Sequence, residues 1–311
     1  MKICCIIGGT GFIGSEVVRQ LASKDIELVV IGRNNKPTRP LPDNVKYYQG
    51  DYGDKYFLEG VLSNVDEVIH LAYSTVPKTS FEDPVNDIST NLPATVKLLE
   101  TALKFNISKL LLVSSGGTIY GKAGKLPIAE DHQFNPISPY GITKLVTEKY
   151  AMMYREMYGL PVVCVRPGNA YGEGQFPFKG QGFIATAIAS ILQNKEVAIF
   201  GEGGTIRDYI HVQDVAGGIL AAFEKGIPGN CYNISSGVGR SNMDILNALR
   251  PYAEKMGLKI NIKSCHARKF DVPANILDST KITLQTGWKP VVSFEKGLER
   301  TWNWILENYI Q

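Results

Sequence analysis

The stretch 3-ICCIIGGTGFIGS-15 decides the fold of this chain. The apolar run 3–7 predicts a buried strand, and a helical pattern begins directly after the glycines that follow it. Gly8 and Gly11 allow a tight turn that brings the backbone close to a pyrophosphate, and Gly14 lets the helix pack against the strand. The helix N-terminus favours an anion at this turn. The stretch therefore predicts a strand–turn–helix unit that binds a dinucleotide through Gly8, Thr10, Gly11, Phe12, Ile13 and Gly14.

Short β-branched runs alternate with helical patterns over the first half of the chain. Further strands are expected at 27–31, 45–49, 66–72, 109–115 and 161–167, and helices at 13–23 and 91–105. This alternation is typical of a parallel sheet. We predict an α/β protein with a Rossmann-type doubly wound parallel sheet and a smaller C-terminal α/β substrate-binding lobe. The dinucleotide-binding domain is expected at 1–170, rejoined by about 208–228, and the lobe mainly at 171–311.

Composition excludes several classes of protein. Among the 311 residues, 33 basic and 30 acidic side chains are interspersed, which leaves no basic stripe for nucleic acid. No apolar run has the length of a membrane span. The five cysteines have no paired spacing, so we expect reduced thiols in a cytoplasmic protein that holds no metal.

A second motif, 138-SPYGITK-144, places Tyr140 and Lys144 four residues apart near a helix start. Residues at that spacing share one helical face. A neighbouring ammonium favours the phenolate of a tyrosine, and the same phenol can protonate an alkoxide when the reaction runs in reverse. The pair can also be an ordinary surface turn. Its position after the glycine turn and after 113-VSSGGTIYG-121 favours a catalytic acid/base.

Several motifs together resemble those of one family. GGTGFIG, 69-IHLA-72, SSGGTIYG, SPYGITK, 166-RPGNAYG-172 and 207-RDYIHVQDVA-216 follow the order seen in extended short-chain dehydrogenase/reductases. The chain resembles the NAD-dependent epimerase/dehydratase family, in particular its nucleotide-sugar branch of UDP-galactose 4-epimerase-like proteins. This resemblance implies hydride exchange between a nicotinamide and a sugar ring carbon, a nucleotide-diphosphate sugar as partner, and a homodimer.

The resemblance also implies roles for individual residues. Tyr140 resembles the acid/base, and Lys144 its partner, which also binds the nicotinamide ribose. Other residues match cofactor-side positions, namely Asp51, Tyr52, Leu71, Ala72, Tyr73, Asn91, Ser114 and Pro167. Positions that hold the substrate are matched by Asn169, Arg207, Arg268 and Asp271, and Lys78 is expected to shape the sugar pocket.

Two departures from the family pattern stand out, and the first is Gly116. In the epimerase pattern this position is a serine whose hydroxyl bonds the sugar oxygen. Ser115 or Thr118 must then supply that hydroxyl, and Thr118 is favoured because the glycine pair 116–117 can bring it inward.

The second departure is Arg33, which stands 19 residues after Gly14, where the family has an aspartate for the adenosine ribose. An arginine can pair with a 2′-phosphate and stack on adenine, and Asn34 or Asn35 can supply a further donor. NADP(H) is therefore favoured. The alternative is that Arg33 points to solvent and NAD is bound.

These departures favour net reduction over epimerisation. Our first prediction is a nucleotide-sugar 4-ketoreductase, in which NADPH delivers hydride to C4 of an NDP-4-keto-6-deoxy sugar and Tyr140 protonates the oxygen. The alternative is a 4-epimerase of UDP-glucose/galactose or UDP-N-acetylhexosamine with tightly bound NAD. A 4,6-dehydratase is disfavoured because the family's T-D-E stretch is replaced by Gly116-Gly117-Thr118. A nucleotide sensor without catalysis is disfavoured because Tyr140 and Lys144 are both present.

Overall fold

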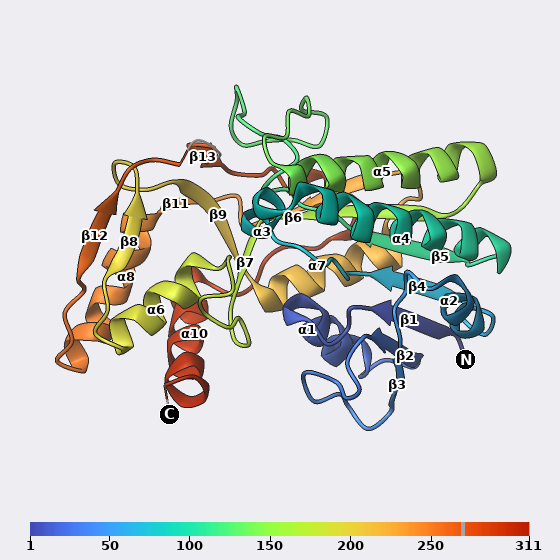
Figure 1. Ribbon diagram of the computed structural model, residues 1–311, viewed down its shortest axis with the longest axis horizontal. Coiled ribbons are helices and arrows are strands. Elements are labelled where there is room, and N and C mark those ends of the chain that lie inside the picture. Colours follow the sequence, from blue (N-terminus) through green and yellow to red (C-terminus); the bar gives the residue numbers. More distant parts are fainter. Residues whose placement is uncertain (269–270, 311) are drawn as a thin grey trace.

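The computed structural model describes residues 1–268 and 271–310. Figure 1 shows a larger domain built on a sheet and a smaller lobe beside it, which carries the last helix. In chain order the elements are β1 (Ile3–Ile7), α1 (Phe12–Leu21), β2 (Glu27–Gly32), β3 (Val45–Gln49), α2 (Lys55–Leu62), β4 (Glu67–His70), α3 (Pro77–Glu82), α4 (Pro84–Lys104), β5 (Lys109–Val113), α5 (Pro139–Tyr158), β6 (Val162–Pro167), β7 (Asn169–Tyr171), α6 (Phe183–Leu192), β8 (Val197–Phe200), β9 (Ile206–His211), α7 (Val212–Lys225), β10 (Cys231–Ile234), β11 (Gly239–Ser241), α8 (Asn242–Lys255), β12 (Ile262–Cys265), β13 (Ala274–Asn275), α9 (Thr280–Thr286) and α10 (Phe294–Asn308).

The larger sheet has seven strands in the order β10-β6-β5-β4-β1-β2-β3, and every neighbouring pair is parallel. Strands of this kind are covered on both faces, which explains their near-continuous apolar runs. One apolar cluster lies on the side of α1 and α7, and another lies on the side of α2, α4 and α5. The predicted Rossmann-type α/β fold is confirmed, and each of the six predicted strands overlaps an observed one.

The chain returns to this sheet after it has begun the second lobe. Helix α7 packs against α1, and β10 pairs with β6 through register partners such as Cys231 and Cys164. The sequence analysis expected a return at about 208–228 but did not include the seventh strand. The domain boundary near residue 170 stays a prediction.

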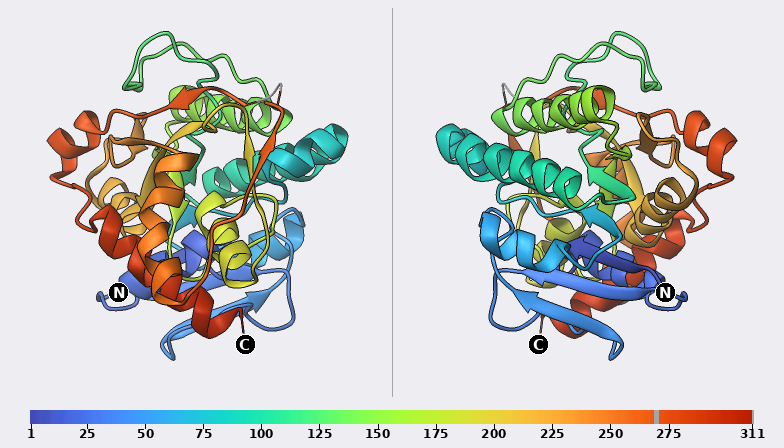
Figure 2. Two further views of the ribbon diagram at one scale, coloured as in Figure 1. Left: turned by 90° about the vertical axis from the view of Figure 1, so that its left-hand side faces the viewer. Right: turned by 90° about the vertical axis from the view of Figure 1, so that its right-hand side faces the viewer.

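The second lobe surrounds its own apolar core. Helices α6, α8 and α10 contribute to that core together with β8 and β9. The ribbon β8–β12 is parallel, and β9 pairs with β7, β11 and β13. A long segment between β5 and α5 projects from the molecule and is seen from the side in Figure 2. Among the described residues, no helix is long and apolar enough to cross a membrane.

Candidate active site

The glycine turn between β1 and α1 has no room for side chains. Gly8 adopts a φ of +87°, and a Cβ there would lie 2.7 Å from the backbone nitrogen of Ala72. A Cβ on Gly14 would lie 2.1 Å from the carbonyl oxygen of Gly8. Gly11 donates its N–H to that same oxygen at 3.0 Å. The turn thus keeps the backbone at the start of α1 open to an anion, as a dinucleotide pyrophosphate requires.

The segment after β2 folds over this turn. The Thr38 hydroxyl donates to the Thr10 carbonyl at 3.0 Å. Arg33 is exposed at the end of β2, and no carboxylate of the described residues lies within ion-pair distance of it. Burial raises the pKa of Tyr52 to about 12, and the nearby charge of Arg33 opposes part of this rise. Arg33 therefore lies at the side where the adenosine is expected, and Asn34 beside it accepts from the Tyr47 hydroxyl.

The predicted catalytic pair lies at the start of α5. Ser138 caps this helix by accepting from the Gly141 N–H, and Pro139 occupies its first turn. The Tyr140 N–H donates to the Ser80 hydroxyl at 3.1 Å. Nζ of Lys144 donates to the Val113 carbonyl at 2.9 Å and lies 5.8 Å from the centroid of the Tyr140 ring. The two side chains therefore face the C-terminal end of β5 together.

Burial governs the ionisation of both groups. Burial raises the pKa of Tyr140 well above its usual value, the charge of Asp87 adds to this, and a hydrogen bond with Ser115 opposes it. Burial also lowers the pKa of Lys144 to about 7, although Glu148 and Asp87 act in the opposite direction. A lysine with a pKa near neutrality can lose or keep its proton as its surroundings change, which suits a partner of an acid/base.

The two candidate hydroxyls lie in different environments. Ser115 acts on the Tyr140 phenol and lowers its pKa, whereas the Thr118 hydroxyl is buried and has no hydrogen-bond partner among the described residues. A Cβ on Gly116 would lie 2.4 Å from Cδ1 of Leu277 and 2.8 Å from the Arg166 carbonyl oxygen. A serine at 116 is therefore sterically excluded from this backbone, and the choice between Ser115 and Thr118 stays a prediction.

The other cofactor-side residues follow the strand ends. The N–H groups of Leu71 and Ala72 both donate to the Ile7 carbonyl. Ser114 and Pro167 end their strands beside them, and Asp51 accepts from the Gly53 N–H. Asn91 is fully buried, and its amide bonds Ser74 N, the Asp87 carbonyl and the Thr75 hydroxyl. Asn91 therefore holds the segment 74–75 in place. A cofactor could bond to Asn91 only through the second lone pair of its Oδ1.

These residues fit a nicotinamide dinucleotide. Buried hydroxyls of Tyr52, Tyr73, Ser114 and Thr118 have no partner in the described protein, and buried polar groups normally have one. The glycine turn supplies the space for a pyrophosphate, and Lys144 has donors that no described acceptor uses. The orphaned groups lie along the strand ends, where the ligand of a doubly wound sheet binds.

Two buried groups near the pair were not predicted. Both ring nitrogens of His70 lack partners, its ring packs 4.9 Å from that of Tyr52, and burial lowers its pKa to about 3. Asp87 is fully buried and accepts from the Thr75 hydroxyl, while its Oδ2 is unpartnered. His70 belongs to the quoted motif 69–72, but no local pattern indicated that Asp87 would face the site.

The structure also brings three of the predicted substrate residues together. Asp271 accepts two hydrogen bonds from Arg268, at 2.7 and 3.0 Å, and lies 4.0 Å from Arg207. Arg207 donates to the Val272 carbonyl, and the Arg268 guanidinium lies 4.4 Å from the Phe200 ring centroid. Residues 269 and 270 of this predicted segment lie outside the described residues.

The remaining two substrate-side predictions are placed differently. A Cβ on Gly117 would lie 3.2 Å from Oδ1 of Asn169, so Asn169 faces the serine–glycine turn. Lys78 is exposed on α3, and its Nζ lies 4.0 Å from Glu82 one turn later on the same helix. Asn169 thus lies close to the acid/base, whereas Lys78 lies at the outer edge of the site.

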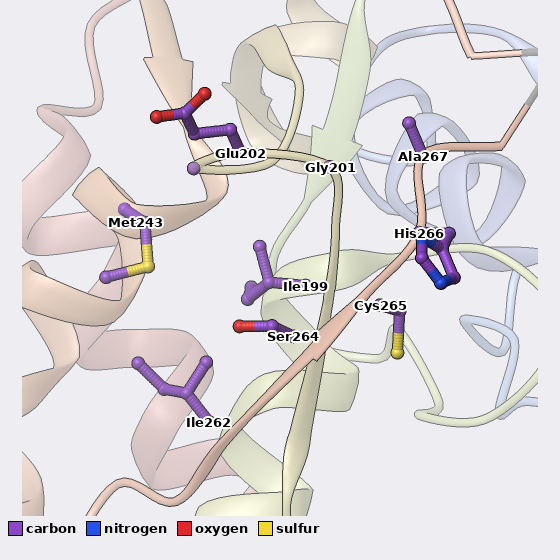
Figure 3. Close-up of a pocket in the computed structure, with 10 residues that line it drawn as sticks. Ile199, Gly201, Glu202, Met243, Ile262, Ser264, Cys265, His266 and Ala267 are labelled. Atoms are coloured by element: carbon purple, nitrogen blue, oxygen red, sulfur yellow. The ribbon is translucent and has the colours of Figure 1, made fainter.

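A cavity of about 560 Å³ lies in the second lobe. Figure 3 shows Ile199 and Ile262 from the ribbon β8–β12, Met243 from α8, and Glu202 and His266 around its rim. No residue predicted for the site lines it, but Ala267 does, and Arg268 follows in the chain. The cavity therefore borders the arginine cluster rather than the acid/base.

The fold and the site together define an extended short-chain dehydrogenase/reductase, with a glycine turn after the first strand, a buried tyrosine–lysine pair and a second lobe carrying an arginine cluster. The model of the NAD dependent epimerase/dehydratase family matches residues 4–235. The chain belongs to this family.

Individual relatives are similar along the full chain. It is 31% identical to the UDP-glucose 4-epimerase of Mycolicibacterium smegmatis, over 95% of this chain and 96% of that protein. The UDP-glucose 4-epimerase of Thermotoga maritima, solved with UDP-glucose, superposes with a TM-score of 0.92 at 34% identity, covering 98% and 99% of the two chains. The dTDP-glucose 4,6-dehydratase of Streptomyces venezuelae, solved with NAD bound, gives 0.91 at 28% identity, covering 98% and 97%.

Proposed function

We propose that this protein is a nucleotide-sugar 4-epimerase that acts on a UDP-hexose and keeps NAD bound through its catalytic cycle. The full-length similarity to two UDP-glucose 4-epimerases supports this alternative better than the 4-ketoreductase that the sequence analysis favoured. The observation that carries it is the position of the Lys144 Nζ, 5.8 Å from the centroid of the buried Tyr140 ring, because this pair supplies an acid/base without the serine missing at 116.

In this proposal Tyr140 transfers the proton of the hydroxyl group on C4 of the sugar. The nicotinamide, when bound, supplies the hydride acceptor and donor. Tyr140 takes the proton of the C4 hydroxyl during oxidation and returns it when the ring is reduced from the opposite face. The Lys144 ammonium stabilises the phenolate that is present before the oxidation and again after the reduction, and Ser115 offsets part of the rise that burial causes in the pKa of Tyr140.

The arginine cluster is proposed to bind the diphosphate and nucleoside. Arg207 and Arg268 converge on Asp271, which orients both guanidinium groups. A diphosphate accepts several charge-assisted hydrogen bonds and would compete with this carboxylate for them. Asn169 borders the turn at Gly117. This position suits a contact of the Asn169 side chain with the sugar end of the substrate.

A second candidate remains the NADPH-dependent 4-ketoreductase. It is favoured by one observation, the exposed Arg33 at the adenosine end of the site, with no carboxylate of the described residues paired to it. Incubating the purified protein with UDP-glucose and no added nicotinamide distinguishes the two, because only an epimerase with retained NAD turns over. A 4,6-dehydratase is not proposed, since Gly117 and Thr118 stand where that branch has an acid pair.

The protein is also proposed to form a homodimer through α4 and α5. These two helices pack side by side and expose large apolar side chains, namely Val85, Ile88, Ile142, Met153 and Met157. An exposed apolar patch is typical of an interface, and these side chains would contribute to one. Light scattering after size-exclusion chromatography tests this, and a monomer of 34.2 kDa at micromolar concentration would contradict it.

A further inference from the structure

Lys144 has a closer aromatic neighbour than its catalytic partner. Its Nζ lies 4.0 Å from the centroid of the Tyr73 ring and 5.8 Å from that of Tyr140. The Tyr73 and Tyr140 rings meet edge to face, with centroids 4.9 Å apart and an interplanar angle of 71°. The ammonium and the two rings therefore form one packed cluster, in which the face of Tyr73 covers the charge.

The backbone on both sides of Tyr73 is held in place. The Ala72 N–H donates to the Ile7 carbonyl at 3.0 Å, and the Ser74 N–H donates to Oδ1 of the buried Asn91 at 2.8 Å. Tyr73 lies three residues after the end of β4, at the end of the sheet where the cofactor is expected. Hydrogen bonds to β1 and to α4 thus fix the backbone at Tyr73, and this places its ring over Lys144.

The charge of Lys144 has few other partners. Its one described hydrogen-bond acceptor is the Val113 carbonyl. Of the ionisable groups around it, Glu148 on α5 is committed to Arg166 at 2.8 Å, and Asp87 on α4 bonds Thr75. Among the described residues, Cys164 on β6 also raises the pKa of Lys144. The charge of Lys144 in turn helps to lower the pKa of His70 on β4. His70 has its pKa lowered to about 3, so it is neutral near pH 7.

A cation buried in this way gains from an aromatic face. The ring quadrupole attracts an ammonium within about 6 Å of the centroid, and the attraction grows when water is excluded. We propose that Tyr73 is a positioning residue that keeps Lys144 charged and directed at the acid/base. The consequence for catalysis rests on the proposed function, but the effect on Lys144 does not.

The direct test is the titration of Lys144 itself. The purified protein, with its bound nucleotide retained, is labelled with [ε-¹³C]lysine and followed by NMR from pH 5 to 10. The Lys144 signal is assigned by its loss in Lys144→Met. Burial places its pKa at about 7, which separates it from exposed lysines. Tyr73→Leu keeps an apolar side chain and removes the ring, so the titration midpoint is expected to fall by about one pH unit.

Matched variants separate a ring effect from a packing effect. Tyr73→Phe keeps the ring and is expected to restore the wild-type midpoint. Tyr154 lies on α5, the helix that carries Lys144, but no contact of its ring with a lysine is found among the described residues. Tyr154→Leu therefore removes a buried ring and is expected to leave the titration midpoint of Lys144 unchanged. If Tyr73→Leu does not fold, Tyr73→Met serves as the ring-free variant. An unchanged midpoint in the folded ring-free variant, or an equal shift in Tyr73→Phe, would overturn the proposal.

Activity gives a second and separate readout. The acid/base needs Lys144 in its ammonium form. Because Tyr73→Leu should lower the pKa of Lys144, the alkaline limb of the pH profile of kcat should move to lower pH in that variant. In Tyr73→Phe it should lie at the wild-type position. If no sugar nucleotide turns over, the proposed function fails while the NMR titration still decides the role of Tyr73. If turnover is found and the titration does not shift, the inference about Tyr73 fails alone.

Discussion

Gly116 and Leu277 lie so close together that a Cβ at 116 would come within 2.4 Å of Cδ1 of Leu277. The Arg166 carbonyl oxygen blocks the same space at 2.8 Å. We therefore expect Gly116→Ser to lower the free energy of unfolding by about 1–3 kcal/mol, as overpacking typically does, without raising activity. Urea denaturation measures this. Gly117→Ser is the control, since its nearest neighbour would be Asn169 Oδ1 at 3.2 Å. A Gly116→Ser variant that is as stable as wild type and more active would contradict this geometry.

Ser115 and Thr118 should differ in their effect on the rate. Ser115 lowers the pKa of the Tyr140 phenol, so Ser115→Ala removes an interaction that favours the phenolate, and we expect kcat to fall about tenfold, the effect of one hydrogen bond. Thr118→Val should change kcat by less than about threefold on the same scale. Steady-state kinetics with a saturating sugar nucleotide checks both. The reverse order of effects would restore Thr118 as the replacement for the missing serine.

His70 should make the protein sensitive to acid. Its pKa is lowered from 6.5 to about 3 by burial, so between these values the unfolded chain binds a proton that the folded chain does not. The free energy of unfolding therefore falls as the pH falls from 6.5, with a slope of up to about 1.4 kcal/mol per pH unit from this group. Denaturation at pH 7.5 and 5 should show a smaller loss in His70→Leu than in wild type. The exposed His266→Leu is the control, and an equal loss in all three proteins would show that His70 is not the source.

Arg33 should decide how the two nicotinamide cofactors compare in affinity. Arg33→Asp places a carboxylate where the adenosine ribose is expected, which repels a 2′-phosphate and can accept from ribose hydroxyls. The ratio of NADPH to NADH affinity is expected to fall at least about tenfold, the value of one charge-assisted contact. Titration of cofactor-free protein by calorimetry measures the ratio. An unchanged ratio would mean that Arg33 does not contact the adenosine ribose or its 2′-phosphate.

The glycine turn and the tyrosine–lysine pair were predictable because each depends on local spacing. Gly8 and Gly14 act within one turn, and Tyr140 and Lys144 share one helical face. Other features depend on contacts between distant parts of the chain. Leu277 excludes a side chain at Gly116 across 161 positions of sequence, Tyr73 reaches Lys144 on α5 from the loop after β4, and β10 joins the sheet only after the second lobe has begun. No local pattern indicates these contacts, so the sequence alone could not place Asp87 near the site.

The cofactor and substrate prediction shows a related difficulty. Arg33 and Gly116 are single departures, and each was given weight toward an NADPH-dependent reduction. Arg33 is exposed, and Ser115 lowers the pKa of Tyr140 although residue 116 is a glycine, so neither departure is an obstacle to an epimerase with NAD. A single exposed side chain constrains the chemistry less than the arrangement of buried groups around the acid/base.

The measurement that tests the central claim most directly is the conversion of UDP-glucose by the purified protein with no added nicotinamide, followed by the anomeric proton signals in NMR. We expect UDP-galactose to appear until both sugars reach equilibrium, NAD to be released on denaturation, and Tyr140→Phe to lower the rate at least about 10²-fold, the usual contribution of a general acid/base. The account would be contradicted by an absence of conversion together with stoichiometric loss of NADPH on addition of an NDP-4-keto-6-deoxy sugar.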